Sequence, residues 1–370
     1  MSALAALEPH PHATAVLGAA LDAGRAPSHA YLLHGPAGTG KRAAARAFAG
    51  ELLARGAPDP DGARARVLSG AHPDLTWVTP SGAHEMLRRD VDEAVVGAAT
   101  RTPFEARFRV FVLERADTMN DEAANALLKT LEEPADFVVL LLLTDRPTQV
   151  LPTIASRCQP VRFDPLAPAA LAERLEAQGV SGAAAQASAR LALGDGGRAL
   201  ALALGDGPAM RAEAEAFARA PLHGITATRP WGALLARARA RGQEAEAELE
   251  AVLAEELANL PKKEHRRRQT EHAERSRRAR RRAETFALDE ALLLVALWYR
   301  DLGCVAAGAP ELAHHADRAA ELRDDAKDRS PAALREAVEL VEDTRARLAL
   351  NVSEELACEA LAYRLERLLS

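Results

Sequence analysis

The chain has 370 residues, of which 48% are apolar and 27% charged, so it should form two or three domains and cannot be disordered over most of its length. Aromatic residues make up only 4% and alanine dominates, which favours helices and argues against a β-sandwich. Cys158, Cys304 and Cys358 lie too far apart for a zinc site or a disulfide framework, so we expect no metal and a reducing cytoplasm. The longest apolar runs, Phe137–Leu143 and Ala291–Tyr299, are under half of the ~20 residues that a membrane helix needs.

The first structural signal along the chain is a strand, a glycine-rich turn and a helix. The short apolar stretch Ala30–Leu33 precedes the turn Gly35–Gly40, and an alanine-rich helical run continues to about Leu53. This order is typical of a phosphate-binding loop between a buried strand and the helix that follows it.

Two further strands and a helix follow. Arg109–Leu113 and Phe137–Leu143 are apolar runs of strand length, and Asp121–Glu133 places its apolar residues on one helical face before Pro134. Strands that alternate with helices predict a parallel α/β sheet.

Strand signals stop after Pro165, and the rest of the chain is predicted to be helical. We expect an α/β nucleotide-binding domain over residues 1–164, an all-α lid over 165–208 and an all-α domain over 209–370. Four amphipathic helices are predicted in the last part, namely Trp231–Leu260, Ala287–Leu302, Pro331–Leu348 and Glu354–Leu369. Within them, Trp298 and Tyr299 are expected in a core or subunit interface, and His314 and His315 at the surface.

Positive charge is concentrated in one segment. Lys262–Arg282 holds eleven Lys and Arg and three Glu, a net charge of +8, which leaves −14 for the remainder of the chain. One interpretation is a solvated helix that projects from the last domain. The alternative is contact with the phosphates of a nucleic acid, without aromatic residues to stack on bases.

The glycine-rich turn has the spacing GxxxxGK. Backbone N–H groups of such a loop surround phosphates at a helix N-terminus, and its lysine reaches the terminal phosphate. The expected nucleotide contacts are Gly35, Pro36, Gly38, Thr39, Gly40 and Lys41. The next residue is Arg42, where a Ser or Thr hydroxyl would bind Mg²⁺, so metal-assisted hydrolysis is compromised.

A second defect lies at the end of the strand Arg109–Leu113. Glu114 stands in the metal-facing position and Arg115 where a carboxylate would polarise water. Because an arginine cannot serve as that base, and a positioned base contributes ~10²–10⁴ in rate, the two defects together make a working hydrolase improbable.

Two more positions are candidates for nucleotide sensing. Thr144-Asp145 follows the strand Phe137–Leu143 and places a polar side chain at its carboxyl end, where α/β sheets bind ligands, but a helix or turn cap is an equal interpretation. Arg157, in Ser156-Arg157-Cys158, follows a proline-containing turn, and on its own would be a surface ion-pair partner.

Several motifs together resemble the AAA+ subunits of the bacterial sliding-clamp loader. They match in order and interval over about residues 1–205, and they are His29–Leu33, the phosphate loop, His72–Leu75, Asn125–Pro134 and Leu151–Gln159. The helical remainder resembles, more weakly, the collar through which these subunits form a pentamer.

Departures from the active ATPases of that family point to one kind of member. Arg42 replaces a Thr, Glu114-Arg115 replaces an acidic pair, and Gly50–Gly70 lacks the cysteines of a zinc module. This pattern is similar to the stationary loader subunit, which does not hydrolyse ATP.

The resemblance implies roles for individual residues and partners. Arg157 would be an arginine finger that acts in trans on a neighbour's nucleotide, and Arg198 would contact nucleotide bound to its own subunit or make a packing contact. The implied partners are ATPase (gamma/tau) and delta subunits in a hetero-pentamer, with the sliding clamp and primer-template DNA reached through the assembly. No cofactor is required, although ATP or ADP bound without hydrolysis is compatible with the loop. The rival interpretation is an autonomous or motor AAA+ ATPase.

Overall fold

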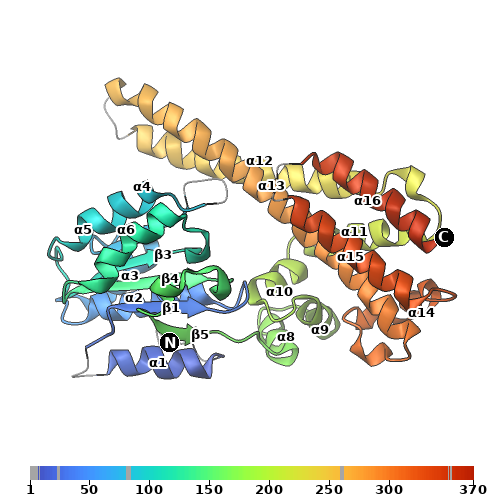
Figure 1. Cartoon of the computed structure of the whole chain (residues 1–370), viewed down its shortest axis with the longest axis horizontal. Coiled ribbons are helices and arrows are strands. Elements are labelled where there is room, and N and C mark those ends of the chain that lie inside the picture. The colour runs from blue at the N-terminus through green and yellow to red at the C-terminus, as the bar shows by residue number, and fades with distance from the viewer. Residues whose placement is uncertain are drawn as a thin grey trace. The chain divides into compact units, whose positions relative to one another are not determined.

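The computed structural model describes residues 7, 9–22, 26–80, 85–258, 262–348, 350 and 352–370, and it forms two compact units (Figure 1). The first comprises Met1–Ala167 with Leu193–Arg198, and the second comprises Pro168–Ala192 with Ala199–Ser370. The chain therefore leaves the first unit after Ala167 and returns to it briefly before completing the second. The division into three domains stays a prediction.

The first unit is built on a five-stranded parallel sheet with strand order β2-β3-β4-β1-β5. Its strands are β1 (Ala30–His34), β2 (Leu75–Val78), β3 (Arg109–Leu113), β4 (Val138–Thr144) and β5 (Gln159–Arg162). All seven residues of β4 are buried, as expected for a central strand of a parallel sheet. The predicted fold class, an AAA+ α/β domain followed by helices, is confirmed.

Helices cover both faces of this sheet. Its helices are α1 (Pro11–Leu21), α2 (Lys41–Ala54), α3 (Pro60–Ser69), α4 (Arg88–Val91), α5 (Gly97–Ala99), α6 (Asp121–Glu132) and α7 (Pro152–Ala155). Alternate residues of β4 separate the two cores: Val139 and Leu141 pack with α1 and α2, whereas Leu140 and Leu142 pack with α6. Gly50–Gly70, which lacks zinc ligands, forms the end of α2 and the helix α3, and the Arg64 guanidinium there donates to the Glu51 carboxylate.

The second unit is helical in its described residues. Its helices are α8 (Pro168–Glu176), α9 (Gly182–Leu191), α10 (Gly196–Ala203, which begins in the first unit), α11 (Gly207–Leu222), α12 (Trp231–Ala258), α13 (Lys262–Ala306), α14 (Ala319–Asp325), α15 (Pro331–Leu348) and α16 (Glu354–Leu369). The C-terminal third of α13 runs through the core of this unit. Trp298 and Tyr299 are at most 1% exposed there, which agrees with their expected place in a core.

The basic segment Lys262–Arg282 is the first half of α13, and α12 and α13 pack together as a long helical hairpin (Figure 1). Residues 244–256 of α12 include six glutamates, and the Arg280 guanidinium lies 3.0 Å from the Glu246 carboxylate across the hairpin. Part of the positive charge therefore faces negative charge on the neighbouring helix. Contact of this segment with nucleic acid stays a prediction.

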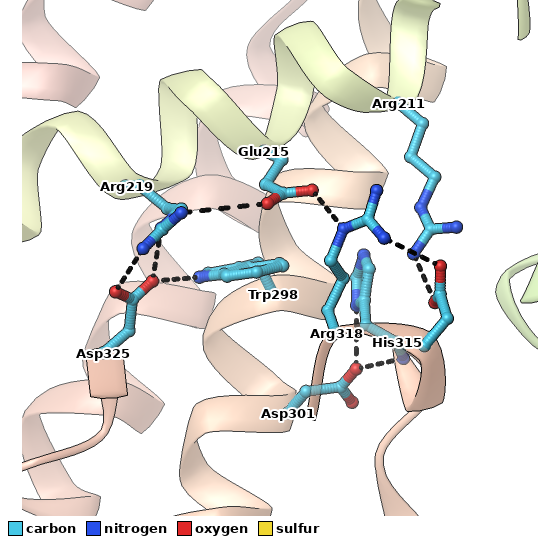
Figure 2. A network of polar contacts seen from close by, with 9 residues as sticks. Arg211, Glu215, Arg219, Trp298, Asp301, His315, Arg318 and Asp325 are labelled. Atoms are coloured by element: carbon cyan, nitrogen blue, oxygen red, sulfur yellow. Dashed lines mark hydrogen bonds and ion pairs between the residues drawn. The ribbon is translucent and has the colours of Figure 1, made fainter. Parts of the chain in front are cut away.

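A network of buried ion pairs ties α11, α13 and the segment around α14 together (Figure 2). Arg219 donates to both carboxylate oxygens of Asp325, at 2.8 and 3.1 Å, and Trp298 Nε1 donates to the same carboxylate. Asp301 accepts hydrogen bonds from the ring and the backbone of His315, each at 2.8 Å.

The expectation that His315 lies at the surface is wrong. This side chain is 3% exposed because Asp301, itself fully buried, needs a hydrogen-bonding partner inside the core. Burial raises the pKa of Asp301, but the His315 hydrogen bonds outweigh burial and hold that pKa below its ordinary value.

Among the described residues, no helix combines the length and apolar character needed to cross a bilayer. The same residues contain no group of three His, Cys, Asp or Glu side chains that could hold a metal ion.

Candidate functional site: the phosphate loop and its surroundings

The phosphate loop connects β1 to α2 at the carboxyl edge of the sheet, and three of its glycines have positive φ angles. These angles are 145° at Gly35, 66° at Gly38 and 89° at Gly40. A Cβ at Gly35 would lie 2.0 Å from the Phe163 carbonyl oxygen, so only glycine fits where the loop passes β5. The loop thus has the backbone that phosphate binding requires.

Lys41 is buried and fully engaged by its own chain. Its Nζ donates to the carbonyl oxygens of Gly35 and Pro36 at 2.8 and 2.5 Å, and it lies 2.6 Å from the Asp145 carboxylate. The lysine side chain is 7% exposed, whereas that of Asp145 is 48% exposed. A phosphate would have to compete with the Asp145 carboxylate for this ammonium group.

Arg42, which stands where a hydroxyl would bind Mg²⁺, forms an ion pair with Glu114, the residue in the metal-facing position. Arg42 Nε lies 2.7 Å from Glu114 Oε1, and the same carboxylate oxygen accepts a hydrogen bond from Trp77 Nε1 at 2.5 Å. Glu114 is 14% exposed in its side chain. The carboxylate that would face Mg²⁺ is therefore paired with a guanidinium, which has no lone pair to offer a metal, and these residues do not fit a magnesium ion.

Arg115 and Thr144 lie beside this pair. Arg115 adopts a left-handed conformation with φ of 54°, and the turn that follows it brings Asp117 toward β4. The Thr144 hydroxyl donates to Asp117 Oδ1 at 2.8 Å and accepts from the Arg146 backbone N–H. Both contacts fit the capping interpretation of Thr144, and its contact with nucleotide stays a prediction.

The segment Leu193–Arg198 packs against the phosphate loop. The Gly196 N–H donates to the Gly38 carbonyl at 3.1 Å, and a Cβ at Gly38 would lie 1.6 Å from Asp195 Oδ1. The same carboxylate caps α10 by accepting the Arg198 backbone N–H at 2.8 Å. The Arg198 backbone is thereby brought near the loop, and a second carboxylate, Asp195, lies beside Gly38 of that loop.

Arg157 lies away from this cluster. It precedes β5, at the end of the sheet where the parallel strands begin, whereas the phosphate loop lies where they end. The first residue of β5, Gln159, pairs with Tyr31 near the start of β1, whereas the phosphate loop follows the end of β1. The guanidinium donates to the Thr153 carbonyl at 2.9 Å and to the Glu132 carboxylate at 2.8 Å, and it is 37% exposed.

Sequence reasoning found the loop and the substituted positions but missed their partners. Asp145 was expected with Thr144 at the ligand-binding end of the strand, but its ion pair with Lys41 was not predicted. Asp195, the second carboxylate at the loop, was not predicted.

A parallel sheet of this order, with a phosphate loop after β1 and helices on both faces, defines a P-loop protein of the AAA+ class. Residues 10–167 match the family model described as "DNA polymerase III, delta subunit".

Named relatives agree with that match. The chain is 45% identical over 136 residues to DNA polymerase III subunit delta' of Pseudomonas aeruginosa, covering 35% of this chain and 42% of the relative. It is 40% identical over 158 residues to subunit delta' of Bacillus subtilis, covering 42% and 47%. It is 35% identical over 183 residues to subunit gamma/tau of Mycobacterium tuberculosis, covering 46% and 30%.

The matched segments span less than half of each of these relatives. Within that extent, the resemblance seen in the sequence is confirmed: residues 10–167 match the DNA polymerase III delta family model, and the matched segments are 40% and 45% identical to subunits named delta'.

Proposed function

We propose that this chain is a stationary, non-hydrolysing subunit of a replicative clamp loader that supplies Arg157 in trans to the active site of a neighbouring ATPase subunit. Its partners would be gamma/tau and delta subunits in a hetero-pentamer that places a sliding clamp on primed DNA in the cytoplasm. Clamp and DNA would be reached through the assembly.

The Arg42–Glu114 ion pair carries the proposal. Hydrolysis by a P-loop protein needs a metal between the loop and the end of β3, and here Arg42 and Glu114, the residues at those two positions, form an ion pair at 2.7 Å. Arg115 adds a second obstacle, because it stands where a base would orient water. The loop can retain ATP or ADP without turning it over, and the proposed role requires no nucleotide on this chain.

The opposite locations of Arg157 and the phosphate loop support action in trans. Strand β1 has five residues, a length of roughly 16 Å at ~3.3 Å per residue, and it separates the two edges. Because an arginine side chain cannot span that distance, Arg157 cannot serve its own loop. A partly exposed guanidinium at the amino edge is available to a nucleotide on another subunit.

The first experiment is ATP hydrolysis by the purified chain, alone and then with gamma/tau, delta, clamp and primed DNA. The proposal predicts no turnover alone and DNA-stimulated turnover in the assembly that depends on adding this chain. Turnover by the chain alone, abolished by Lys41→Ala, would instead support the motor-ATPase interpretation.

A further inference from the structure

The outer parts of α12 and α13 form an arm that extends beyond the core of the second unit (Figure 1). Among the described residues of these two helices, those buried in the core lie at positions 231–238 of α12 and 288–302 of α13. The arm, defined as residues 242–258 and 262–284, contributes none of them. The outer faces of the arm are therefore not needed for the packing of the unit and can contact another molecule.

One face of α13 is turned toward α12 within the arm. His272, Ser276 and Arg280 recur at intervals of four residues, which places them on one side of an α-helix. His272 and Ser276 are 6% and 5% exposed, and the Arg280 guanidinium lies 3.0 Å from the Glu246 carboxylate of α12. The remaining sides of α13 therefore point away from α12.

Arg275 and Arg277 leave α13 on two different sides outside that face. Both are exposed, and no carboxylate pairs with either one within the part of the chain that the structure describes. Because an α-helix turns by about 100° per residue, positions two apart differ by about 200°. The two guanidinium groups therefore stand on nearly opposite flanks of the helix.

The charge of the arm is divided between its two helices. Lys262–Arg282 of α13 carries a net charge of +8, whereas residues 244–256 of α12 hold six glutamates and no lysine or arginine. A molecule of high negative charge is therefore attracted to the α13 side and repelled by the α12 side. This division gives the arm one preferred face for a polyanion.

We propose that the arm binds duplex DNA, with α13 lying along the major groove and Arg275 and Arg277 contacting phosphates of opposite strands. The major groove of B-form DNA is about 12 Å wide, admits an α-helix and has a phosphate backbone on each side. That arrangement supplies phosphates to both flanks of the helix, whereas a partner with a flat surface reaches only one flank. Contacts to phosphates do not read the bases, so the binding is independent of sequence.

Other partners fit the same residues less well. The major groove of A-form RNA is too deep and narrow for side chains to enter. Single strands are bound by stacking of bases on aromatic side chains, and protein interfaces bury apolar residues at their centre. Lys262–Arg282 contains no aromatic residue, and its only apolar residues are two alanines. The proposed function does not require this contact, because it assigns DNA binding to the assembly and not to this chain.

The test measures binding of the purified full chain to a fluorescein-labelled DNA duplex of about 30 base pairs by fluorescence anisotropy, between 50 and 200 mM NaCl. The affinity should be micromolar at 50 mM NaCl, and its logarithm should fall linearly with the logarithm of the salt concentration. Arg275→Gln and Arg277→Gln should each reduce the slope by about 1, because each removes one phosphate contact. The double variant should weaken binding at 50 mM NaCl at least tenfold.

Arg335→Gln with Arg364→Gln is the matched control. It removes two exposed arginines from α15 and α16 of the same unit and so changes the net charge equally, but it should leave the affinity and the slope unchanged. Arg275→Lys with Arg277→Lys keeps both charges and should retain the slope, which separates a lost phosphate contact from a folding defect.

Three results overturn the proposal. They are no binding to the duplex at 50 mM NaCl, a slope that depends on only one of Arg275 and Arg277, and equal or tighter binding of single-stranded DNA or duplex RNA of the same length. ATP hydrolysis by the wild-type assembly is a separate measurement that reports on the proposed function alone, so either proposal can fail without the other.

Discussion

Nη2 of Arg157 lies 2.8 Å from the Glu132 carboxylate, while Nη1 of the same guanidinium donates to the Thr153 carbonyl. These two contacts orient the side chain from the end of α6 and from α7, and both partners belong to the same unit. An ion pair of this exposure contributes at most about 1 kcal/mol, so a phosphate on a neighbouring subunit can compete with Glu132 for the arginine.

Arg157→Ala should lower DNA-stimulated ATP hydrolysis of the reconstituted loader at least tenfold, because an arginine finger contributes ~10³–10⁵ to turnover where it acts fully. Size-exclusion chromatography should show intact assembly. Arg157→Lys is the matched control: it keeps the charge but loses the planar fork, and it should restore only part of the rate. Wild-type turnover in Arg157→Ala would leave this residue as a surface ion-pair partner.

Arg42→Thr should make nucleotide binding respond to Mg²⁺. In the wild-type chain the guanidinium blocks the metal position, so ADP affinity measured by calorimetry should be the same with Mg²⁺ or EDTA. In the variant, a hydroxyl and a released Glu114 can both bind the ion, and Mg²⁺ should raise the affinity at least fivefold. Hydrolysis should not return, because Arg115 supplies no base. Arg46→Thr on the same helix is the control, and a magnesium response in wild type would contradict the interpretation.

Asp301→Asn should destabilise the second unit by about 2 kcal/mol. The substitution keeps the shape of the side chain but removes the charge that strengthens its two hydrogen bonds with His315, and bonds to charged groups contribute about 1.5–3 kcal/mol. Urea unfolding followed by tryptophan fluorescence, in a Trp77→Phe background so that only Trp231 and Trp298 report, measures the change. An unfolding midpoint equal to that of the background chain would count against a stabilising pair.

Stability of the second unit should fall in acid. Burial raises the pKa values of Asp301 and Asp317, but hydrogen bonds from His315 and Arg211 outweigh it and hold both pKa values below the ordinary value of about 3.9. A lowered carboxyl pKa contributes stability that is present above the unfolded-state pKa and is lost as the pH falls through the folded-state pKa. Through these two carboxyl groups the free energy of unfolding should therefore decrease below about pH 4. Asp301→Asn should make that decrease shallower, and an unchanged slope would exclude Asp301 as a contributor.

Central elements of the fold could be predicted because their apolar patterns are continuous. Strand β3 has the predicted bounds Arg109–Leu113, and β4 is displaced by one residue from the prediction. The two edge strands were missed. Strand β5, with sequence QPVR, buries only Val161, and β2 has three partly buried residues and one buried residue, so neither shows the apolar run of a central strand.

The site was predictable in its loop but not in its ion pairs. Arg42 and Glu114 are 72 positions apart, and their contact depends on how α2 and β3 are placed by the sheet order, which no local pattern encodes. The same holds for Asp301 and His315. Asp301, one position before the end of the predicted helix Ala287–Leu302, nevertheless indicates that an inward-facing partner is needed.

Arg157 lies where the strands of the sheet begin and the phosphate loop lies where they end, so the two sites can contact two different neighbouring subunits. Subunits that join through two different edges form a head-to-tail row, in which each member gives to one neighbour and receives from the other. A member whose own nucleotide site is closed by ion pairs can supply an arginine to one neighbour without using the arginine of the other. In the proposed role, such a chain stands at one end of the row of ATP-hydrolysing subunits. Its position in the assembly then determines which subunits have an active ATP site.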